Sequence, residues 1–228
     1  MGIRTFRSLL VIALLVLSES AWSFVFFGEG LFPPLQIPAR EESVYGFRIN
    51  PGWAAHGEMK GGDFNLIGGI SDKEFAGFAF SGVFNRNYGK TQVYGIQAAG
   101  LLNLNQGESL IVGLQLALGA NVQGGAGSVY GFQVSGIGNW AEKMNVYGGQ
   151  SGMINRAKVL GGVQLGLFNT TETMAGFQLG MVNSAKTVYG FQIGLWNSTD
   201  NLHGIQLGLV NLVSNGPIKF LPVFNIGI

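Results

Sequence analysis

The chain has 228 residues, no cysteine and a formal net charge of +1. The absence of cysteine excludes disulfides and thiolate chemistry, and a charge near zero argues against a nucleic acid as partner. Only 11% of the residues are charged and 47% are hydrophobic, which excludes the composition of an intrinsically disordered chain.

The N-terminal segment has the pattern of a secretory signal peptide. Arg4 and Arg7 give it a positive start, and residues 9–17 form an almost unbroken apolar run. Ala21-Trp22-Ser23 then matches the small-x-small pattern that a signal peptidase cleaves. The apolar run is about half the roughly twenty residues that a membrane-spanning helix needs. We therefore predict that residues 1–23 are a signal peptide and that the protein is exported.

Residues 24–43 follow as an irregular lead-in, because Pro33, Pro34 and Pro38 break any regular element there. From residue 44 to residue 228 one short motif recurs without a linker, which indicates a single repeat domain. The best copies read hydrophobic-x-Gly-hydrophobic-Gln-hydrophobic-Gly-hydrophobic-x-Asn, at residues 160–169, 174–183, 188–197 and 202–211.

The spacing of the repeat changes along the chain. Gly162, Gly176, Gly190 and Gly204 recur every 14 residues, whereas the upstream glycines at positions 77, 95, 113 and 131 recur every 18. Each upstream copy also has one extra residue between its Gly and its Asn. We count about twelve units of this kind along the domain.

Each unit has the periodicity of a β-strand. Phe191, Ile193 and Leu195 alternate with Gln192 and Gly194, the period of two that a strand requires. Short polar stretches such as residues 170–173 and 198–201 separate the units and are typical of turns. The repeat domain is therefore predicted to be all-β.

Two architectures fit one strand-like unit per repeat. The first is a β-solenoid of about twelve 14- to 18-residue units, and the alternative is an antiparallel outer-membrane β-barrel of about twelve strands. The recurring Gln and Asn favour the solenoid, because amides form ladders when identical residues stack in register. The extra residue of the 18-residue units also favours it, since an insertion inverts the facing of a straight strand but is harmless at a corner. The even number of strands and the alternating C-terminal residues favour the barrel.

The solenoid model predicts which side chains of each strand point into the interior and which point into solvent. We expect positions such as Phe191 and Ile193 to form a hydrophobic interior and the Gly/Gln stripe to face solvent. Tyr189 would lie beyond a corner at Gly190 and point outwards. Residues 24–40 and 217–228 are the expected caps for the open ends of the sheet.

The repeat unit Gly-x-Gln-hydrophobic-Gly-Leu-x-Asn resembles that of the bacterial surface-repeat proteins found in Leptospira and, in a related form, in Bacteroidetes. The resemblance is strongest from Val129 to Asn211, and the ending from Asn215 to Gly227 is also similar. It implies export and a location at the cell surface or outer membrane of a Gram-negative-type bacterium, with the periplasm as an alternative. It implies no reaction, cofactor or ligand.

No group of residues has the pattern of an active site, so we expect no enzyme, no catalytic, metal or cofactor-binding residues, and no cofactor. His56 and Glu58 share a strand face, but two ligands do not close a metal site. His203 occupies a variable position and is expected on the surface. Asp63, Asp72 and Glu74 are expected in a solvated loop, and the Gly-rich run at 124–127 in a turn.

The predicted function is that of an exported, surface-associated structural or interaction protein, similar to an adhesin. Its expected partners are an envelope or host ligand and the outer membrane, and not a nucleic acid. The alternative function is that of an integral outer-membrane barrel, with a small pore as one form. The recurring Gln could likewise form either a ligand-binding face or an internal ladder that fixes the stacking register.

Overall fold

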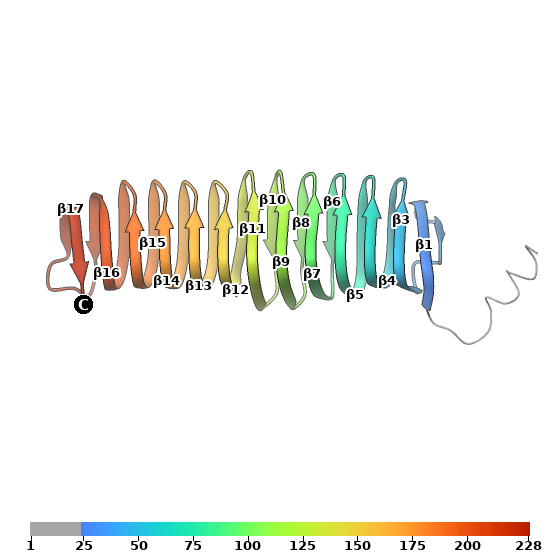
Figure 1. The fold of residues 1–228 in the computed structure, drawn as a ribbon, viewed down its shortest axis with the longest axis horizontal. Helices are drawn as coiled ribbons and strands as arrows, with labels where there is room; N and C mark the ends of the chain where they lie inside the picture. The colour runs from blue at the N-terminus through green and yellow to red at the C-terminus, as the bar shows by residue number, and fades with distance from the viewer. Residues whose placement is uncertain (1–23) are drawn as a thin grey trace, which may run out of the picture.

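The computed structural model describes residues 24–228, in which a single 17-stranded sheet winds into a rod of stacked coils (Figure 1). No helix occurs in this part of the chain, so the all-β prediction is confirmed. The predicted signal peptide, residues 1–23, lies outside the described residues. The strands are β1 (Phe24–Phe32), β2 (Leu35–Ile37), β3 (Ser43–Asn50), β4 (Trp53–Asn65), β5 (Gly68–Ser81), β6 (Phe84–Asn87), β7 (Lys90–Ala99), β8 (Leu102–Asn105), β9 (Ser109–Ala117), β10 (Ala120–Gln123), β11 (Gly127–Ser135), β12 (Gly138–Ser151), β13 (Ile154–Leu165), β14 (Phe168–Leu179), β15 (Val182–Ile193), β16 (Trp196–Val213) and β17 (Phe220–Gly227).

Neighbouring coils are parallel and pair identical positions of the repeat. Between β15 and β16, for example, Asn183 pairs with Asn197 and Gln192 pairs with Gln206. Within the described residues only β1–β2 and β16–β17 are antiparallel. The β-solenoid is therefore confirmed, and the antiparallel arrangement that the barrel alternative requires is wrong for this chain.

Each coil has one glycine at the same position, so the number of these glycines gives the number of coils. Eleven of them occupy the same place in successive coils with positive φ values, from 99° to 151°: Gly46, Gly61, Gly77, Gly95, Gly113, Gly131, Gly148, Gly162, Gly176, Gly190 and Gly204. The rod thus has about eleven coils, close to the twelve units expected from the sequence.

The two repeat lengths differ at the corners, as predicted. Val134 and Gly138 of a longer coil pair with Ser151 and Ile154 of the next, shorter one. Three residues connect Val134 to Gly138, whereas two residues connect Ser151 to Ile154. In the 14-residue coils the chain passes the second corner without leaving the sheet, so β13, β14 and β15 each cover 12 residues. The longer coils have wider corners and are divided into separate strands.

The inner and outer faces of the strand are exchanged relative to the prediction. Gln192 is completely buried, whereas Phe191 is 46% exposed and Ile193 is half-buried on the outer side. Val188 and Ala185 complete the interior of this coil, and the corresponding column of the other coils holds mainly aliphatic side chains, with Phe75 as the largest hydrophobic one. The expected hydrophobic interior of Phe191 and Ile193 is therefore wrong, as is the solvent-facing Gln stripe. Tyr189 points outwards, as predicted.

Both ends of the rod are capped by the segments that the sequence indicated. At the N-terminal end β1 pairs in parallel with β3 and antiparallel with β2, so residues 24–37 are more regular than their prolines suggest. At the C-terminal end β17 folds back antiparallel on β16. Each cap covers the open edge of the last coil, which would otherwise present unpaired backbone groups.

Candidate functional site

The interior of the rod contains two continuous ladders of side-chain amides. In the glutamine ladder each Nε2 donates to Oε1 of the glutamine in the preceding coil, at 2.7–2.8 Å, and the members are Gln97, Gln115, Gln133, Gln150, Gln164, Gln178, Gln192 and Gln206. All of them are at most 1% exposed. The structural interpretation of the repeated Gln is confirmed, and a Gln face for ligands is excluded by burial.

The asparagine ladder runs with the opposite polarity. Asn183 Nδ2 donates to Asn197 Oδ1 of the following coil at 2.9 Å, and its second hydrogen goes to the carbonyl of Ile193, also at 2.9 Å. Glutamine amides therefore donate towards the N-terminal end of the rod and asparagine amides towards the C-terminal end. The two rows of amide dipoles oppose each other, and buried polar groups that are paired in this way do not destabilise a core.

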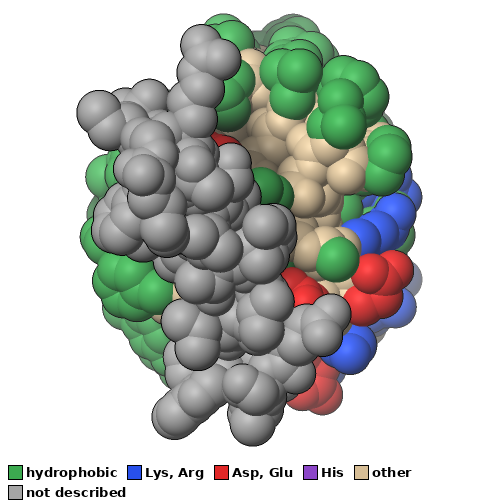
Figure 2. Space-filling model, turned by 90° about the vertical axis from the view of Figure 1, so that its right-hand side faces the viewer, with side chains coloured by type: hydrophobic (Ala, Val, Ile, Leu, Met, Phe, Trp, Pro, Cys, Tyr) green, Lys and Arg blue, Asp and Glu red, His purple; other side chains and the backbone are tan. Residues whose placement is uncertain are grey.

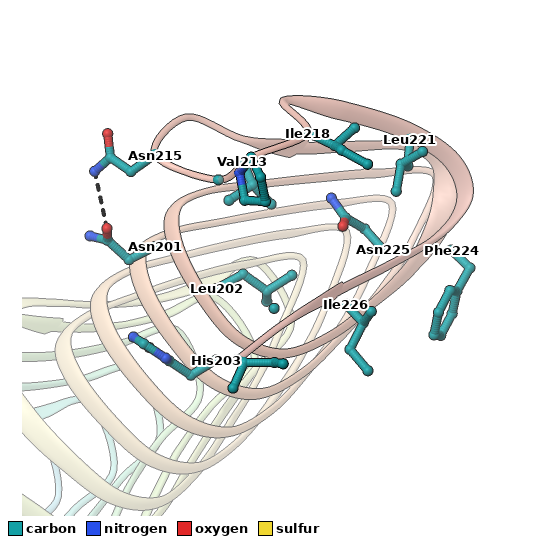
Figure 3. Close-up of a pocket in the computed structure, with 14 residues that line it drawn as sticks. Asn201, Leu202, His203, Val213, Asn215, Ile218, Leu221, Phe224, Asn225 and Ile226 are labelled. Carbon is teal, nitrogen blue, oxygen red and sulfur yellow. Dashed lines mark hydrogen bonds between the residues drawn. The ribbon is translucent and has the colours of Figure 1, made fainter.

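A small cavity lies beneath the C-terminal cap, close to the last coil (Figure 3). It has a volume of about 300 Å³ and is lined mainly by apolar residues, among them Leu202, Val213 and Ile218. Asn225, 4% exposed, pairs in register with Gln206, and neither Asn225 Nδ2 nor Gln206 Oε1 has a hydrogen-bond partner among residues 24–228. An amide N–H can donate to an amide oxygen, so Asn225 occupies the position that the next glutamine of the ladder would take, and it also lines the cavity.

At the N-terminal end the ladder stops at Gln97, and the same column continues through Ala79 to a buried ion pair. Arg48 and Asp63 occupy the glutamine column in β3 and β4, and both are buried. Arg48 Nε and Nη2 donate to the two carboxylate oxygens of Asp63 at 2.7 and 2.6 Å. This bidentate geometry compensates for taking both charges out of water.

His56 completes this buried cluster. Its Nδ1 lies 3.0 Å from Arg48 Nη1 and its Nε2 lies 3.2 Å from the carbonyl of Pro38. Because a guanidinium can only donate, Nδ1 accepts and Nε2 carries the proton that goes to Pro38. Burial, together with the Arg48 charge, lowers the pKa of His56 to about 4. The histidine is therefore neutral at neutral pH and has a structural role.

His56 and Glu58, the two candidate metal ligands, have different partners in the structure. Glu58 accepts a hydrogen bond from Tyr45 at 2.6 Å and lies 3.0 Å from Lys60, and both contacts lower the pKa of Glu58. Lys60 also pairs with Glu74 at 2.9 Å, and Glu74 and then Glu58 raise its pKa. No group of three His, Cys, Asp or Glu side chains in the described residues could hold a metal ion.

The expected solvated acidic loop does not exist as one feature. Asp63 is buried against Arg48, and Asp72 is paired with Arg40 at 2.9 Å. The prediction that Asp63 lies in a solvated loop is therefore wrong. His203 is exposed and stacks on Tyr189 with ring centroids 4.8 Å apart, as expected of a surface position. Residues 124–126 form the turn between β10 and β11, also as expected.

The outer surface of the rod carries a feature that the sequence analysis missed, which we call the apolar strip. It consists of the outward-facing residues between the repeat Gly and the repeat Asn, represented in one coil by Phe191, Ile193, Leu195 and Trp196. In every coil from β3 to β16 the strip contains large hydrophobic side chains that are at least 36% exposed, for example Phe47, Leu66, Phe80, Leu101, Leu118, Phe132, Met153, Phe168, Met181, Leu195 and Leu209.

The strip contains no exposed charge. In these segments of the eleven coils the charged residues are Arg48 and Asp63, which are buried and paired with each other. At a spacing of about 4.8 Å per coil the strip is roughly 50 Å long.

Charged side chains gather on the opposite edge of the rod, in the segment that follows the repeat Asn. We call this the charged edge, and it includes Glu142, Arg156, Lys158, Glu172, Lys186 and Asp200. Pairs form between successive coils, with Arg156 2.6 Å from Glu142 and Lys186 3.0 Å from Glu172. Viewed along the rod, hydrophobic side chains follow the rim across the top and down the left, and charged side chains lie together at the lower right (Figure 2).

No protein-family profile matches this chain, and no curated protein or solved structure is significantly similar to it. Within residues 24–228 there is also no helix with the length and hydrophobicity needed to cross a membrane.

Proposed function

We propose that this protein is an exported, non-catalytic structural and interaction protein of a bacterial envelope, located at the cell surface or the outer membrane. The observation that carries the proposal is the division of the outer surface into an uncharged apolar strip and a charged edge. A strip that runs the length of the rod is larger than the apolar patches usual on soluble monomers, and such patches mark interaction sites.

The arrangement of the polar residues supports a non-catalytic role. The repeated Gln and Asn are buried in ladders, and the Arg48–Asp63–His56 cluster is closed to solvent. Catalysis needs polar groups that converge on an accessible site. The pattern of residues 1–23 and the resemblance to surface-repeat proteins support export.

Export can be tested on the full chain expressed in a Gram-negative host. We expect the protein in the envelope fraction, with Phe24 as its new N-terminal residue in N-terminal sequencing. Proteinase added to intact cells should degrade it if it is on the surface. A matched variant, Leu14→Arg, places a charge in the apolar run and should leave the unprocessed chain in the cytoplasm. Wild-type protein that stays unprocessed in the cytoplasm would contradict the proposal.

A further inference from the structure

We infer that the apolar strip is a docking surface for a lipid bilayer. In this arrangement the rod lies flat on the membrane, with the strip among the outer parts of the acyl chains and the charged edge in water. The inference rests on the proposed function and names the partner of the same surface.

The N–H groups along the strip are paired with neighbouring coils, which meets a first requirement for contact with hydrocarbon. Strands in the middle of the rod have a hydrogen-bonded neighbour on both sides. The corner is paired as well, since Gly194 N donates to Leu207 O at 2.9 Å and Leu195 N donates to Met181 O at 3.0 Å. Immersion of the strip in lipid would therefore leave both N–H groups of this corner, those of Gly194 and Leu195, with their partners.

The side chains of the strip offer almost nothing to a polar partner. Its exposed and half-buried side chains are hydrocarbon apart from the indoles of Trp53 and Trp196, the Ser151 hydroxyl, and the weakly polar thioethers of Met153 and Met181. An interface with another protein usually has about one hydrogen bond for every 100–200 Å², and a glycan needs more polar contacts still. Acyl chains need none, so the chemistry of the strip favours lipid.

Tyrosines line one border of the strip. Tyr94, Tyr130, Tyr147 and Tyr189 directly precede the repeat Gly and are 43–51% exposed. Tyr130 and Tyr147 stack with ring centroids 5.2 Å apart, which holds their rings in a row along the rod. Tyrosine combines an apolar ring with a polar hydroxyl and is enriched at the boundary between membrane and water. The tyrosines therefore lie where the boundary between membrane and water would run if the strip were in contact with a bilayer.

The shape of the strip favours a bilayer over a second copy of the chain. The strip continues from the sheet around the corner that follows β13, β14 and β15, so its surface is convex (Figures 1 and 2). Two convex rods contact each other along a narrow line and leave most of both strips in water. A fluid bilayer adapts to a convex surface and covers its full width.

The experiment is vesicle flotation with the protein purified from the envelope fraction after expression of the full chain. The vesicles are phosphatidylcholine alone, which has no net charge. We expect the wild-type protein to float with the vesicles in low salt and in roughly 1 M NaCl, because contact through hydrocarbon is not screened by salt. The variant Met181→Glu/Leu195→Glu should reduce the ratio of floating to free protein by about tenfold or more.

The matched control is Gln106→Glu/Thr170→Glu, which adds the same charge at exposed positions outside the strip. Circular dichroism and thermal unfolding establish that both variants are folded, and the control should float like the wild type. Three results would overturn the inference: no flotation of the wild type, equal loss in both variants, or a dimer that forms instead and dissociates in the Met181→Glu/Leu195→Glu variant. None of these three results would contradict the proposed function, provided that the protein is found in the envelope. The proposed function would be contradicted by a different result, namely that the protein is not exported.

Discussion

At Gly190 the backbone has a φ of +134°, and a Cβ placed there would lie 2.1 Å from the carbonyl oxygen of Gly176 in the preceding coil. Both the backbone conformation and the stacking distance therefore require glycine. Gly95 provides a natural contrast, because it has a φ of +99° but no atom within 4 Å of its ideal Cβ. Its pairing partner β5 shifts register between Gly77 and Ala79, which opens space at this position.

We predict that Gly190→Ala costs more stability than Gly95→Ala. The second substitution has only the strain of a positive φ, about 1–2 kcal/mol. The first also forces two coils apart and should cost about 3 kcal/mol or more. Midpoints and slopes of urea unfolding measure the difference, and equal losses would show that contact between coils does not explain the glycine column.

The glutamine ladder makes a second prediction at the residue scale. Gln178→Leu leaves Gln164 Oε1 and Gln192 Nε2 buried without partners, so the more hydrophobic core should be less stable by about 2–5 kcal/mol. The neighbouring Leu179 is 44% exposed, and Leu179→Gln should change stability by less than about 1 kcal/mol. Thermal unfolding of both variants distinguishes this facing from a hydrophobic interior, for which the order would be reversed.

His56 makes stability depend on pH. Its pKa in the folded protein is about 4, below the ordinary value of 6.5, so the unfolded chain binds a proton first as pH falls. Its contribution is thus complete above pH 6.5 and is lost as pH falls towards 4, by about 3 kcal/mol in total. Urea unfolding at several pH values should show this slope in the wild type.

The same slope should be largely absent in His56→Gln. His203→Gln is the control, and because the His203 side chain is exposed this substitution should leave the slope unchanged. A slope that persists in His56→Gln would assign the pH dependence to other groups.

At the scale of the element, one coil is a unit that can be removed. Thr173 pairs with Thr187 and Met174 with Val188, so deletion of residues 174–187 joins Thr173 to Val188 with every remaining pair in register. Each coil contacts only the coils directly before and after it, as in other repeat proteins. We predict that the shortened chain folds, with an unchanged far-ultraviolet circular dichroism signal per residue.

Deletion of residues 178–190 is the matched control, because it removes 13 residues, joins Phe177 to Phe191 inside a strand, and shifts Gln192 by one position. A shift of one position exchanges the inner and outer faces of a strand. This chain should fail to give a cooperative thermal transition. If both deletions were tolerated equally, the 14-residue register would not be what specifies the stack.

At the scale of the whole molecule, the caps limit the length of the rod. Removal of residues 217–228 would expose the edge of β16, whose backbone groups now pair with β17. Exposed edges of this kind pair with other chains. We predict concentration-dependent, end-to-end oligomers, measured by light scattering and seen as longer rods in negative-stain micrographs.

Lys219→Ala is the control for this truncation, since it changes the same segment but leaves β17 in place. It should have the same molar mass as the wild type. A truncated chain with the wild-type molar mass at every concentration would show that the cap is not needed to end the sheet.

Several features of this rod follow from the sequence by itself. Identical residues at 14- and 18-residue spacing require parallel coils in register, because only then do Gln192 and Gln206 meet. The extra residue before Asn103 had to lie at a corner, since inside a strand it would invert the facing of the residues after it. The prolines near both ends indicated where the sheet is capped, although residues 24–37 pair more regularly than expected.

Only the tertiary structure decided which face of the strand lies inside. Alternation separates Phe191 from Gln192 but does not say which of the two is buried, and the larger hydrophobic residue is the usual choice. Stacked coils change this preference, because glutamines repeated at the spacing of a parallel sheet donate to and accept from one another along the whole ladder. The same inversion places the large hydrophobic side chains outside and creates the apolar strip. The Arg48–Asp63–His56 cluster could not be predicted from the sequence either, because its members lie on neighbouring coils and only the winding of the chain brings them together.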